Sequence, residues 1–269
     1  MAIMITKIPG IKTVFLDMDG VLWRSDEPVL DIRELFDRIK KEGLNVYCIT
    51  NNSARTVEYY QEKFETFSVV LNRDQIITSA EAVSMFLIKK FHKGGYVYIV
   101  GEEGLVVTLH RKKFIQALEP DLNNILAVVV GLDRNLTYKK LADATHLVTN
   151  GVPLIGTNPD KSLPIPTGVA PGAGSIISAI ETASGIQATI IGKPERFVFQ
   201  LALDRANCLP EQAIMIGDRL DTDILGAQDI GIQTGLVLSG VTTKSLAESW
   251  DRAPTYIAEN AIGILEDIF

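Results

Sequence analysis

Short apolar runs alternate with amphipathic segments along almost the whole chain. Runs such as 14–16 and 213–217 are apolar at every position, which is typical of strands in a parallel sheet buried on both faces. Segment 31–41 instead repeats its apolar residues at helical spacing. The repeated alternation predicts an α/β fold with a Rossmann-like parallel sheet that is covered by helices on both faces.

The same pattern gives approximate bounds for the individual elements. The predicted strands are 14–16, 44–50, 96–101, 127–131, 153–156, 189–191, 213–217 and 233–238. The predicted helices are 31–41, one after Ser53 that runs through Phe67, 78–91, a helix-like segment between 101 and 127, 136–147, 174–184, 195–206, 222–229 and one from about 260. Ser79 is expected to cap the helix of 78–91, and Pro194 is expected in the first turn of the helix that follows it.

Two carboxylates follow the first predicted strand. Asp17 and Asp19 come directly after the run 14–16, and Gly20 permits a sharp turn. Sheets of this kind bind ligands at the carboxyl ends of their strands. Two negative charges so close together are unfavourable unless a cation neutralises them, so the pair predicts a metal site. A solvated pair on a surface turn is the alternative.

Polar residues also follow the next predicted strand. Thr50 ends it with a hydroxyl group, and Asn51 begins a turn whose backbone amides precede a helix. Such amides suit an anion, phosphate for example. The alternative is that Asn52 and Ser53 only cap the helix, and the two roles are compatible.

Two further strands end in charged residues. Lys193 lies on a short turn after 189–191, where its ammonium group would be held toward the strand ends, although an isolated lysine is more often a solvated surface charge. Asp218 follows 213–217, and Asp223 comes five residues later, whereas Asp221 is expected to be a helix N-cap. Because all of these motifs fall at the carboxyl ends of predicted strands, the sequence predicts that they form one site.

Together, the motifs resemble the haloacid dehalogenase superfamily, in particular its NagD-like, p-nitrophenylphosphatase branch. The matching segments are Asp17-Met18-Asp19-Gly20, Thr50-Asn51-Asn52-Ser53, Gly192-Lys193-Pro194 and Gly217-Asp218 followed by Asp223. The branch is indicated by Val130-Gly131-Leu132-Asp133, Gly156-Thr157-Asn158-Pro159-Asp160 and Pro171-Gly172-Ala173-Gly174-Ser175. The resemblance extends from about residue 10 to residue 265.

The resemblance implies a Mg²⁺-dependent phosphomonoester hydrolase that acts on a small phosphorylated metabolite through an aspartyl-phosphate. Asp17 would be the nucleophile, and Asp19 would act first as an acid and then as a base. The implied Mg²⁺ ligands are the Asp17 side chain, the Asp19 carbonyl and Asp218. The superfamily's dehalogenases lack an acid at the position of Asp19, so this residue favours ester hydrolysis or phosphotransfer.

The remaining roles concern the phosphoryl group. Thr50, the Asn51 amide and Lys193 are implied to bind the phosphoryl oxygens, and Thr50 and Lys193 count with Asp17 and Asp19 as the catalytic residues. Asp223 is implied to orient Lys193 or a metal-bound water. The substrate stays open among sugar phosphates, phosphoglycolate, nucleotides and pyridoxal phosphate.

The long connection between the second and third motifs has strands and helices of its own, which predicts a domain and not a loop. The expected organisation is a catalytic core of residues 1–81 and 186–269 with an inserted α/β cap domain of residues 82–185. The resemblance implies that this cap closes over the site. The candidate specificity residues are Asn52, Thr157, Asn158 and Asp160, and the alternative for 158–160 is a simple tight turn.

Two other functions stay open on the same motifs. One is a phosphotransferase or mutase that passes the phosphoryl group to a second substrate, which product analysis with and without an acceptor would distinguish. The other is a non-catalytic regulator that binds a phosphorylated ligand. A regulator would be expected to have lost a catalytic acid, and every acid is present, so it ranks last.

Composition limits the partners and the compartment. A formal charge of -7 with 46% hydrophobic and 22% charged residues is typical of an ordinary globular protein and argues against a nucleic-acid partner. No apolar stretch is long enough to span a membrane, and residues 1–12 lack a signal-peptide core. Cys48 and Cys208 show no metal-binding spacing, so a cytoplasmic location is expected. The oligomeric state stays open, with a homodimer as one alternative.

Overall fold

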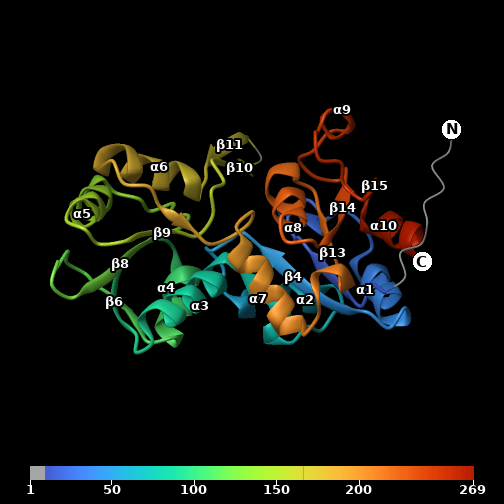
Figure 1. Ribbon diagram of the computed structural model, residues 1–269, viewed down its shortest axis with the longest axis horizontal. Helices are drawn as coiled ribbons and strands as arrows, with labels where there is room; N and C mark the ends of the chain where they lie inside the picture. The colour runs from blue at the N-terminus through green and yellow to red at the C-terminus, as the bar shows by residue number, and fades with distance from the viewer. Residues whose placement is uncertain (1–9, 166) are drawn as a thin grey trace. The chain divides into compact units, whose positions relative to one another are not determined.

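The computed structural model describes residues 10–165 and 167–269 (Figure 1). Most of the N-terminal segment that is predicted to lack a signal-peptide core therefore lies outside the described residues. The chain divides into two compact units, which are described separately. The first unit comprises Met1–Thr50, Gln61–Ile77 and Phe199–Phe269, and the second comprises Asn51–Tyr60 and Thr78–Val198. The domain limits expected from the sequence, with an insert at 82–185, stay a prediction.

The first unit is built on a six-stranded sheet in the order β15-β14-β13-β1-β4-β5. Its strands are β1 (Thr13–Leu16), β4 (Asn45–Thr50), β5 (Ile76–Thr78), β13 (Ala213–Gly217), β14 (Gln233–Val237) and β15 (Tyr256–Ala258). The pairings from β15 to β4 are parallel, and Leu16 of β1 lies between Cys48 of β4 and Ile216 of β13. The strand order therefore reverses at β1, which is where open α/β sheets place their ligands.

Helices and one hairpin complete this unit. They are the hairpin β2 (Trp23–Arg24) and β3 (Glu27–Pro28), the helices α1 (Ile32–Lys41), α8 (Leu225–Gln228), α9 (Lys244–Glu248) and α10 (Ala261–Ile268), and the short turns η1 (Arg73–Gln75), η2 (Pro210–Gln212) and η3 (Leu220–Ile224). Two of the boundaries between the units fall within helices, namely α2 (Val57–Thr66) and α7 (Arg196–Ala206). The turn η3 is π-helical.

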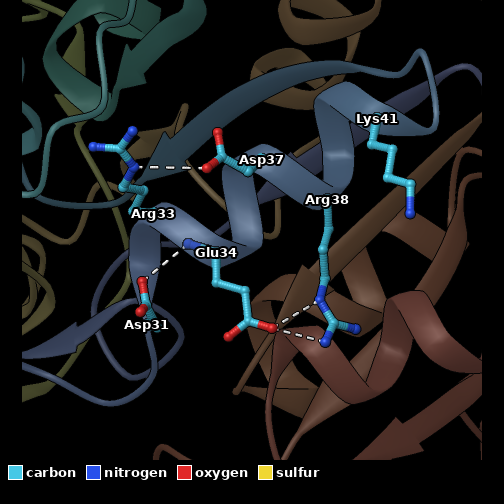
Figure 2. Close-up of a pocket in the computed structure, with 6 residues that line it drawn as sticks. All are labelled: Asp31, Arg33, Glu34, Asp37, Arg38 and Lys41. Atoms are coloured by element: carbon cyan, nitrogen blue, oxygen red, sulfur yellow. Dashed lines mark hydrogen bonds and ion pairs between the residues drawn. The ribbon is translucent and has the colours of Figure 1, made fainter.

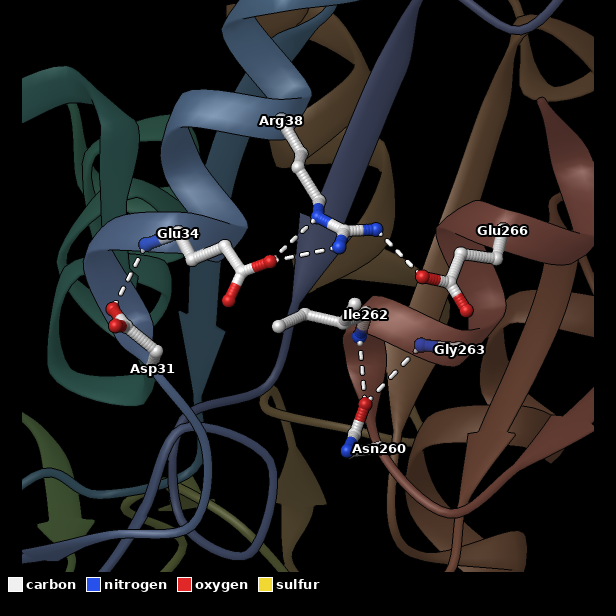
Figure 3. A network of polar contacts seen from close by, with 7 residues as sticks. All are labelled: Asp31, Glu34, Arg38, Asn260, Ile262, Gly263 and Glu266. Carbon is white, nitrogen blue, oxygen red and sulfur yellow. Dashed lines mark hydrogen bonds and ion pairs between the residues drawn. The ribbon is translucent and has the colours of Figure 1, made fainter.

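Helix α1 begins where the sequence predicts, because Asp31 caps it by accepting a hydrogen bond from the backbone N–H of Glu34 at 2.9 Å. Figure 3 shows how Arg38 joins α1 to α10: its guanidinium contacts Glu34 and Glu266, each at 2.7 Å. Asn260 caps α10 in the same way as Asp31 caps α1. Because the Arg38 ion pairs are exposed, the buried apolar faces of the two helices contribute more to their stability.

The second unit has a five-stranded sheet in the order β12-β9-β8-β6-β7, with every pairing parallel. Its strands are β6 (Gly95–Val100), β7 (Phe114–Gln116), β8 (Ile125–Val130), β9 (Leu154–Gly156) and β12 (Thr189–Ile190), and a separate hairpin is formed by β10 (Ser162–Ile165) and β11 (Gly168–Pro171). Its helices are α3 (Ser79–Phe91), α4 (Glu103–Arg111), α5 (Tyr138–Thr149) and α6 (Ala173–Ser184). In Figure 1, α5 and α6 lie on one side of this sheet and α3 and α4 on the other. The parallel α/β architecture predicted from the sequence is confirmed.

Several local predictions differ from the structure. The sequence analysis did not predict the strands β5, β7 and β15 or the hairpin of β10 and β11. Thr78 and not Ser79 caps α3, accepting a hydrogen bond from the backbone N–H of Glu81 at 3.1 Å. Asp221 is not an N-cap, because it lies inside the η3 turn and forms an exposed ion pair with Arg219 at 3.0 Å. Among the described residues, none of the helices combines the length and apolarity needed to cross a membrane.

Candidate active site

Asp17 and Asp218 extend from two neighbouring strands of the first unit. The backbone N–H of Asp17 donates to the carbonyl of Ile216 at 2.9 Å, which continues the pairing of β1 with β13 by one residue. Asp218 comes directly after β13, so both acids lie at the carboxyl edge of the sheet. Both are buried, with exposed fractions of 6% for Asp17 and 1% for Asp218.

A third carboxylate joins them. One oxygen each from Asp17, Asp218 and Asp223 lies within 4.8 Å of the other two, and Asp223 is also buried. We call these three residues the acid cluster. The η3 turn holds Asp223 in place, since its Oδ2 accepts a hydrogen bond from the backbone N–H of Arg219 at 3.1 Å. Three buried carboxylates in such close proximity fit a hard divalent cation, because hard cations prefer oxygen ligands and neutralise the repulsion. Asp223 is therefore a candidate ligand in its own right.

Glycines allow the backbone to approach the acid cluster closely. Gly20 has a φ of +89°, and a Cβ atom there would lie 2.5 Å from Oδ2 of Asp218. A Cβ atom at Gly240 would overlap the same carboxylate, and one at Gly217 would overlap Asp223. Larger residues at these three positions would therefore displace the carboxylates.

The loop after β14 supplies a contact that the sequence analysis missed. The backbone N–H of Val241 donates to Oδ2 of Asp218 at 2.7 Å, and that of Thr242 donates to the Asp218 carbonyl at 3.2 Å. A hydrogen bond from a backbone amide stabilises the ionised carboxylate. The sequence contains a signal for this loop. A polar residue and a glycine, Ser239 and Gly240, follow the predicted strand 233–238, just as Asp19 and Gly20 come shortly after the predicted strand 14–16.

Asp19 and Thr50 lie at the same carboxyl edge of the first unit. Asp19 is exposed, and the turn after it closes through a hydrogen bond from the backbone N–H of Gly20 to the Trp23 carbonyl at 2.7 Å. Thr50 ends β4 and is buried. Since β4 and β1 are adjacent and parallel, Thr50 and Asp17 end neighbouring strands. The carboxylate of Asp19 therefore has access to solvent, unlike the buried Asp17.

Cys48 occupies β4 beside Leu16 of β1. Complete burial raises the pKa of its thiol far above the ordinary value, and the negative charge of Asp17 raises that pKa further. The thiol is therefore protonated at neutral pH and inert as a nucleophile.

In the second unit, the side chain of Asn51 is bonded to the backbone of Lys193. Oδ1 of Asn51 accepts from the Lys193 N–H at 2.8 Å, and Nδ2 donates to the Lys193 carbonyl at 3.0 Å. Lys193 is buried, and its peptide bond to Pro194 is cis. Pro194 precedes α7 and does not occupy its first turn as predicted, because the helix begins at Arg196.

The candidate specificity residues of this unit have partners within the protein. Thr157 and Asn158 are buried, and Asn158 donates to the Asn51 carbonyl at 2.7 Å. Asp160 accepts from Nδ2 of Asn51 at 3.2 Å. The turn predicted as the alternative for 158–160 is present, since Oδ1 of Asn158 accepts from the Asp160 N–H at 3.1 Å.

Asn52 and Ser53 do not cap the next helix. Oδ1 of Asn52 accepts from the backbone N–H of Ala54 at 2.9 Å, which forms a local turn. The helix α2 begins four residues after Ser53, and Thr56 caps it by accepting from the backbone N–H of Tyr59 at 3.2 Å. The capping alternative for Asn52 and Ser53 is therefore wrong, and the role of Asn52 in specificity stays a prediction.

The structure thus brings the predicted residues together in two sets, one in each unit. The first unit gathers Asp17, Asp19, Thr50, Asp218 and Asp223 at one sheet edge, and the second gathers Asn51, Thr157, Asn158, Asp160 and Lys193. That these sets form one active site stays a prediction.

A hollow of about 400 Å³ also lies along α1 (Figure 2). It is lined by charged side chains, namely those of Asp31, Arg33, Glu34, Asp37, Arg38 and Lys41. Arg33 contacts Asp37, and Arg38 contacts Glu34, so these charges largely neutralise each other at an exposed helix surface. The hollow therefore has none of the buried, convergent polar groups that mark a catalytic site.

A parallel α/β sheet with buried acids at the carboxyl ends of β1 and β13 is typical of enzymes that carry their chemistry at that edge. Comparison with known proteins identifies the enzyme class. A family model described as haloacid dehalogenase-like hydrolase matches residues 14–115, and a second, HAD-hydrolase-like model matches residues 190–263. The chain belongs to the haloacid dehalogenase-like hydrolase family and is a phosphatase.

Relatives are similar over nearly their whole length. An acid sugar phosphatase from Staphylococcus saprophyticus is 32% identical over 257 residues, which cover 96% of this chain and 98% of the relative. Its counterpart from Staphylococcus epidermidis is 33% identical, with 91% and 93% covered. Among solved structures, a p-nitrophenyl phosphatase from Archaeoglobus fulgidus has a TM-score of 0.90 at 28% identity, with 96% and 99% of the chains covered. NagD from Escherichia coli has a TM-score of 0.84 at 31% identity, with 94% and 97% covered.

Proposed function

We propose that this phosphatase hydrolyses small phosphorylated metabolites, sugar phosphates first among them, in a Mg²⁺-dependent reaction that passes through an aspartyl-phosphate. The observation that carries the proposal is the acid cluster of Asp17, Asp218 and Asp223 at the carboxyl edge of the sheet. Three buried carboxylates without a cation would repel both each other and a phosphate dianion.

Mg²⁺ fits this donor set better than a softer metal, because the groups that converge here are carboxylates. Asp17 and Asp218 would hold it with the Asp19 carbonyl, and the position of Asp223 supports a share in binding. When bound, the cation would neutralise the charge of the acids and of the phosphate oxygens.

In the first step, a carboxylate oxygen of Asp17 attacks the phosphorus atom as the bond to the leaving oxygen breaks. Asp19 donates a proton to that leaving oxygen, so the product departs as an alcohol. The burial of Asp17 and the exposure of Asp19 support this division, since a nucleophile benefits from a fixed position and a proton carrier from solvent access.

In the second step, Asp19 accepts a proton from water, and the resulting nucleophile attacks the same phosphorus atom. The bond between phosphorus and Asp17 breaks, which releases inorganic phosphate and restores both carboxyl groups. Thr50, the backbone amide of Asn51 and the Lys193 ammonium group are proposed to bind the phosphoryl oxygens as charge spreads over them. Residues 82–185 are proposed as a cap that supplies contacts to the leaving group.

The names of the relatives support sugar phosphates as the substrate class, since several relatives are acid sugar phosphatases, and they support p-nitrophenyl phosphate as a working substrate. The test is a screen of sugar phosphates, phosphoglycolate, nucleotides and pyridoxal phosphate with Mg²⁺, in which released phosphate is measured. We expect release without any added acceptor and the highest kcat/KM for a sugar phosphate. Product that forms only when an acceptor alcohol is added would identify a phosphotransferase instead.

A further inference from the structure

Asn51 makes every hydrogen bond that its side-chain amide group can donate. Both donors of Nδ2 are used, one on the Lys193 carbonyl at 3.0 Å and one on Oδ2 of Asp160 at 3.2 Å. Oδ1 accepts from the Lys193 N–H at 2.8 Å. The amide can face only one way, because a carbonyl and a carboxylate oxygen accept hydrogen bonds and a backbone N–H donates one. The side chain therefore holds both backbone polar groups of Lys193 in a fixed direction.

The backbone carbonyl of Asn51 is held just as firmly. Ser79 Oγ and Asn158 Nδ2 both donate to it, each at 2.7 Å. A carbonyl oxygen has two lone pairs, and these two donors occupy them. Asn158 thus fixes the backbone of Asn51 while Asp160 fixes its side chain.

The residue before Lys193 is fixed to the same segment. The backbone N–H of Gly192 donates to the Thr157 carbonyl at 2.9 Å. A Cβ atom at Gly192 would lie 2.7 Å from Oδ1 of Asn51, so the fit leaves no room for a larger residue. The turn that carries Lys193 is therefore bonded to both Asn51 and Thr157.

Asn158 has little capacity left for a ligand. Its exposed fraction is 4%, its Nδ2 contacts the Asn51 carbonyl and Oγ1 of Thr157, and its Oδ1 accepts from the Asp160 N–H. To donate to a substrate, this side chain would have to break one of its two Nδ2 hydrogen bonds, which is unfavourable for a buried amide. Its burial also leaves little of Oδ1 accessible to a ligand.

We propose that Asn158 and Asp160 are positioning residues for Lys193, and that they act through Asn51 and not by contact with the leaving group. The proposal rests on the proposed function, in which the Lys193 ammonium group binds the phosphoryl oxygens. Every ester substrate presents the same phosphoryl group. Loss of positioning must therefore slow all esters by the same factor, whereas loss of a specificity contact would change their order.

Two substitutions of Asp160 separate positioning from charge. Asp160→Ala removes the acceptor for Asn51, and we expect kcat to fall on the order of tenfold on every ester in the screen, with their ranking unchanged. Asp160→Asn keeps an oxygen acceptor of the same shape, so it should restore most of the loss. Asp121→Ala, at an exposed site of the same unit, is the matched control and should leave kcat unchanged.

The decisive experiment is a double-mutant cycle of Asp160→Ala with Lys193→Ala. In the Lys193→Ala background, Asp160→Ala should change kcat less than twofold, because there is no ammonium group left to position. Where turnover is too slow to measure, the same four proteins are compared by their Kd for inorganic phosphate in the presence of Mg²⁺. Asp160→Ala should then raise the Kd only when Lys193 is present.

Three outcomes would overturn the proposal: a changed ranking of esters, an equal loss in both backgrounds, or an Asp160→Asn variant as poor as Asp160→Ala. Failure of the proposed function has a different signature, namely a wild-type protein that releases phosphate from no ester or a Lys193→Ala variant with wild-type turnover. The phosphate-binding cycle still decides the positioning question in the first of those cases. In the second, Lys193 does not act on the phosphoryl group, and the positioning proposal falls with it.

Discussion

An oxygen of Asp17 and an oxygen of Asp218 lie within 4.8 Å of each other, although the two residues are far apart in the chain. The parallel pairing of β1 with β13 causes this proximity, since each acid is the residue that follows its strand. Val241 donates a backbone hydrogen bond to Asp218 and so favours its ionised form. Buried carboxylates at this distance repel each other unless a positive charge is bound, and the first prediction follows from that requirement.

Removal of divalent metal should abolish phosphate release from p-nitrophenyl phosphate, and added Mg²⁺ should restore it. Asp218→Asn should raise the Mg²⁺ concentration needed for half-maximal activity by on the order of tenfold or more. Asp221→Asn is the matched control, because Asp221 is exposed, contacts Arg219 and lies outside the acid cluster. Full turnover in excess chelator would exclude the assigned metal role.

Asp17→Asn and Asp19→Asn should fail in different ways. The first variant lacks the nucleophile, so no phosphoenzyme should form. The second should still form one from p-nitrophenyl phosphate, because a good leaving group needs little protonation, but its hydrolysis should be slow without a base. Mass spectrometry of the acid-quenched Asp19→Asn variant should find phosphate on Asp17. Phosphate on a serine of the Asp19→Asn variant would assign the nucleophile to another residue. The absence of phosphate from Asp17 of that variant would remove the role proposed for Asp17.

Gly240→Ala should weaken Mg²⁺-dependent activity at least tenfold, because the added Cβ atom would overlap the Asp218 carboxylate and displace it from the acid cluster. The activity is measured as a function of Mg²⁺ concentration together with the thermal unfolding midpoint. Gly151→Ala is the control: its φ of +92° makes alanine strained there, but no atom lies within 4 Å of the new Cβ. If both variants lost activity equally, general destabilisation and not displacement of Asp218 would be the cause.

Cys48 should resist thiol reagents in the folded protein at pH 8. Burial raises the pKa of its thiol, and the nearby Asp17 charge raises that pKa further, so the reactive thiolate is suppressed in the native state. Unfolding returns the pKa to about 8.5, where a substantial fraction is thiolate at pH 8. As the pH rises from 7 to 9, labelling in denaturant should therefore accelerate while native Cys48 stays protected. Cys208, whose pKa is raised less completely by partial burial, should label first. Equal native and unfolded rates at Cys48 would contradict this.

Much of the fold followed from local pattern. Strands such as β1 and β13 are buried on both faces and read as unbroken apolar runs, and α1 shows its cap and its buried stripe in the sequence itself. The β10–β11 hairpin could not be predicted from local pattern, because its strands are largely exposed and carry no alternation of buried and exposed positions. Burial leaves a periodic signature only where one face or both are consistently covered.

The sequence by itself determined that the chain is an α/β protein with acids after β1 and β13, since strand-forming runs and the residues that end them are contiguous. Only the tertiary structure decided that Asp223 joins Asp17 and Asp218, because the π-helical turn η3 sets the direction of its side chain. It also decided that Asn158 and Asp160 bind Asn51, more than 100 positions earlier in the chain. Hydrogen bonds across such separations depend on which elements pack against each other, and the local pattern of apolar and polar residues does not specify that pairing.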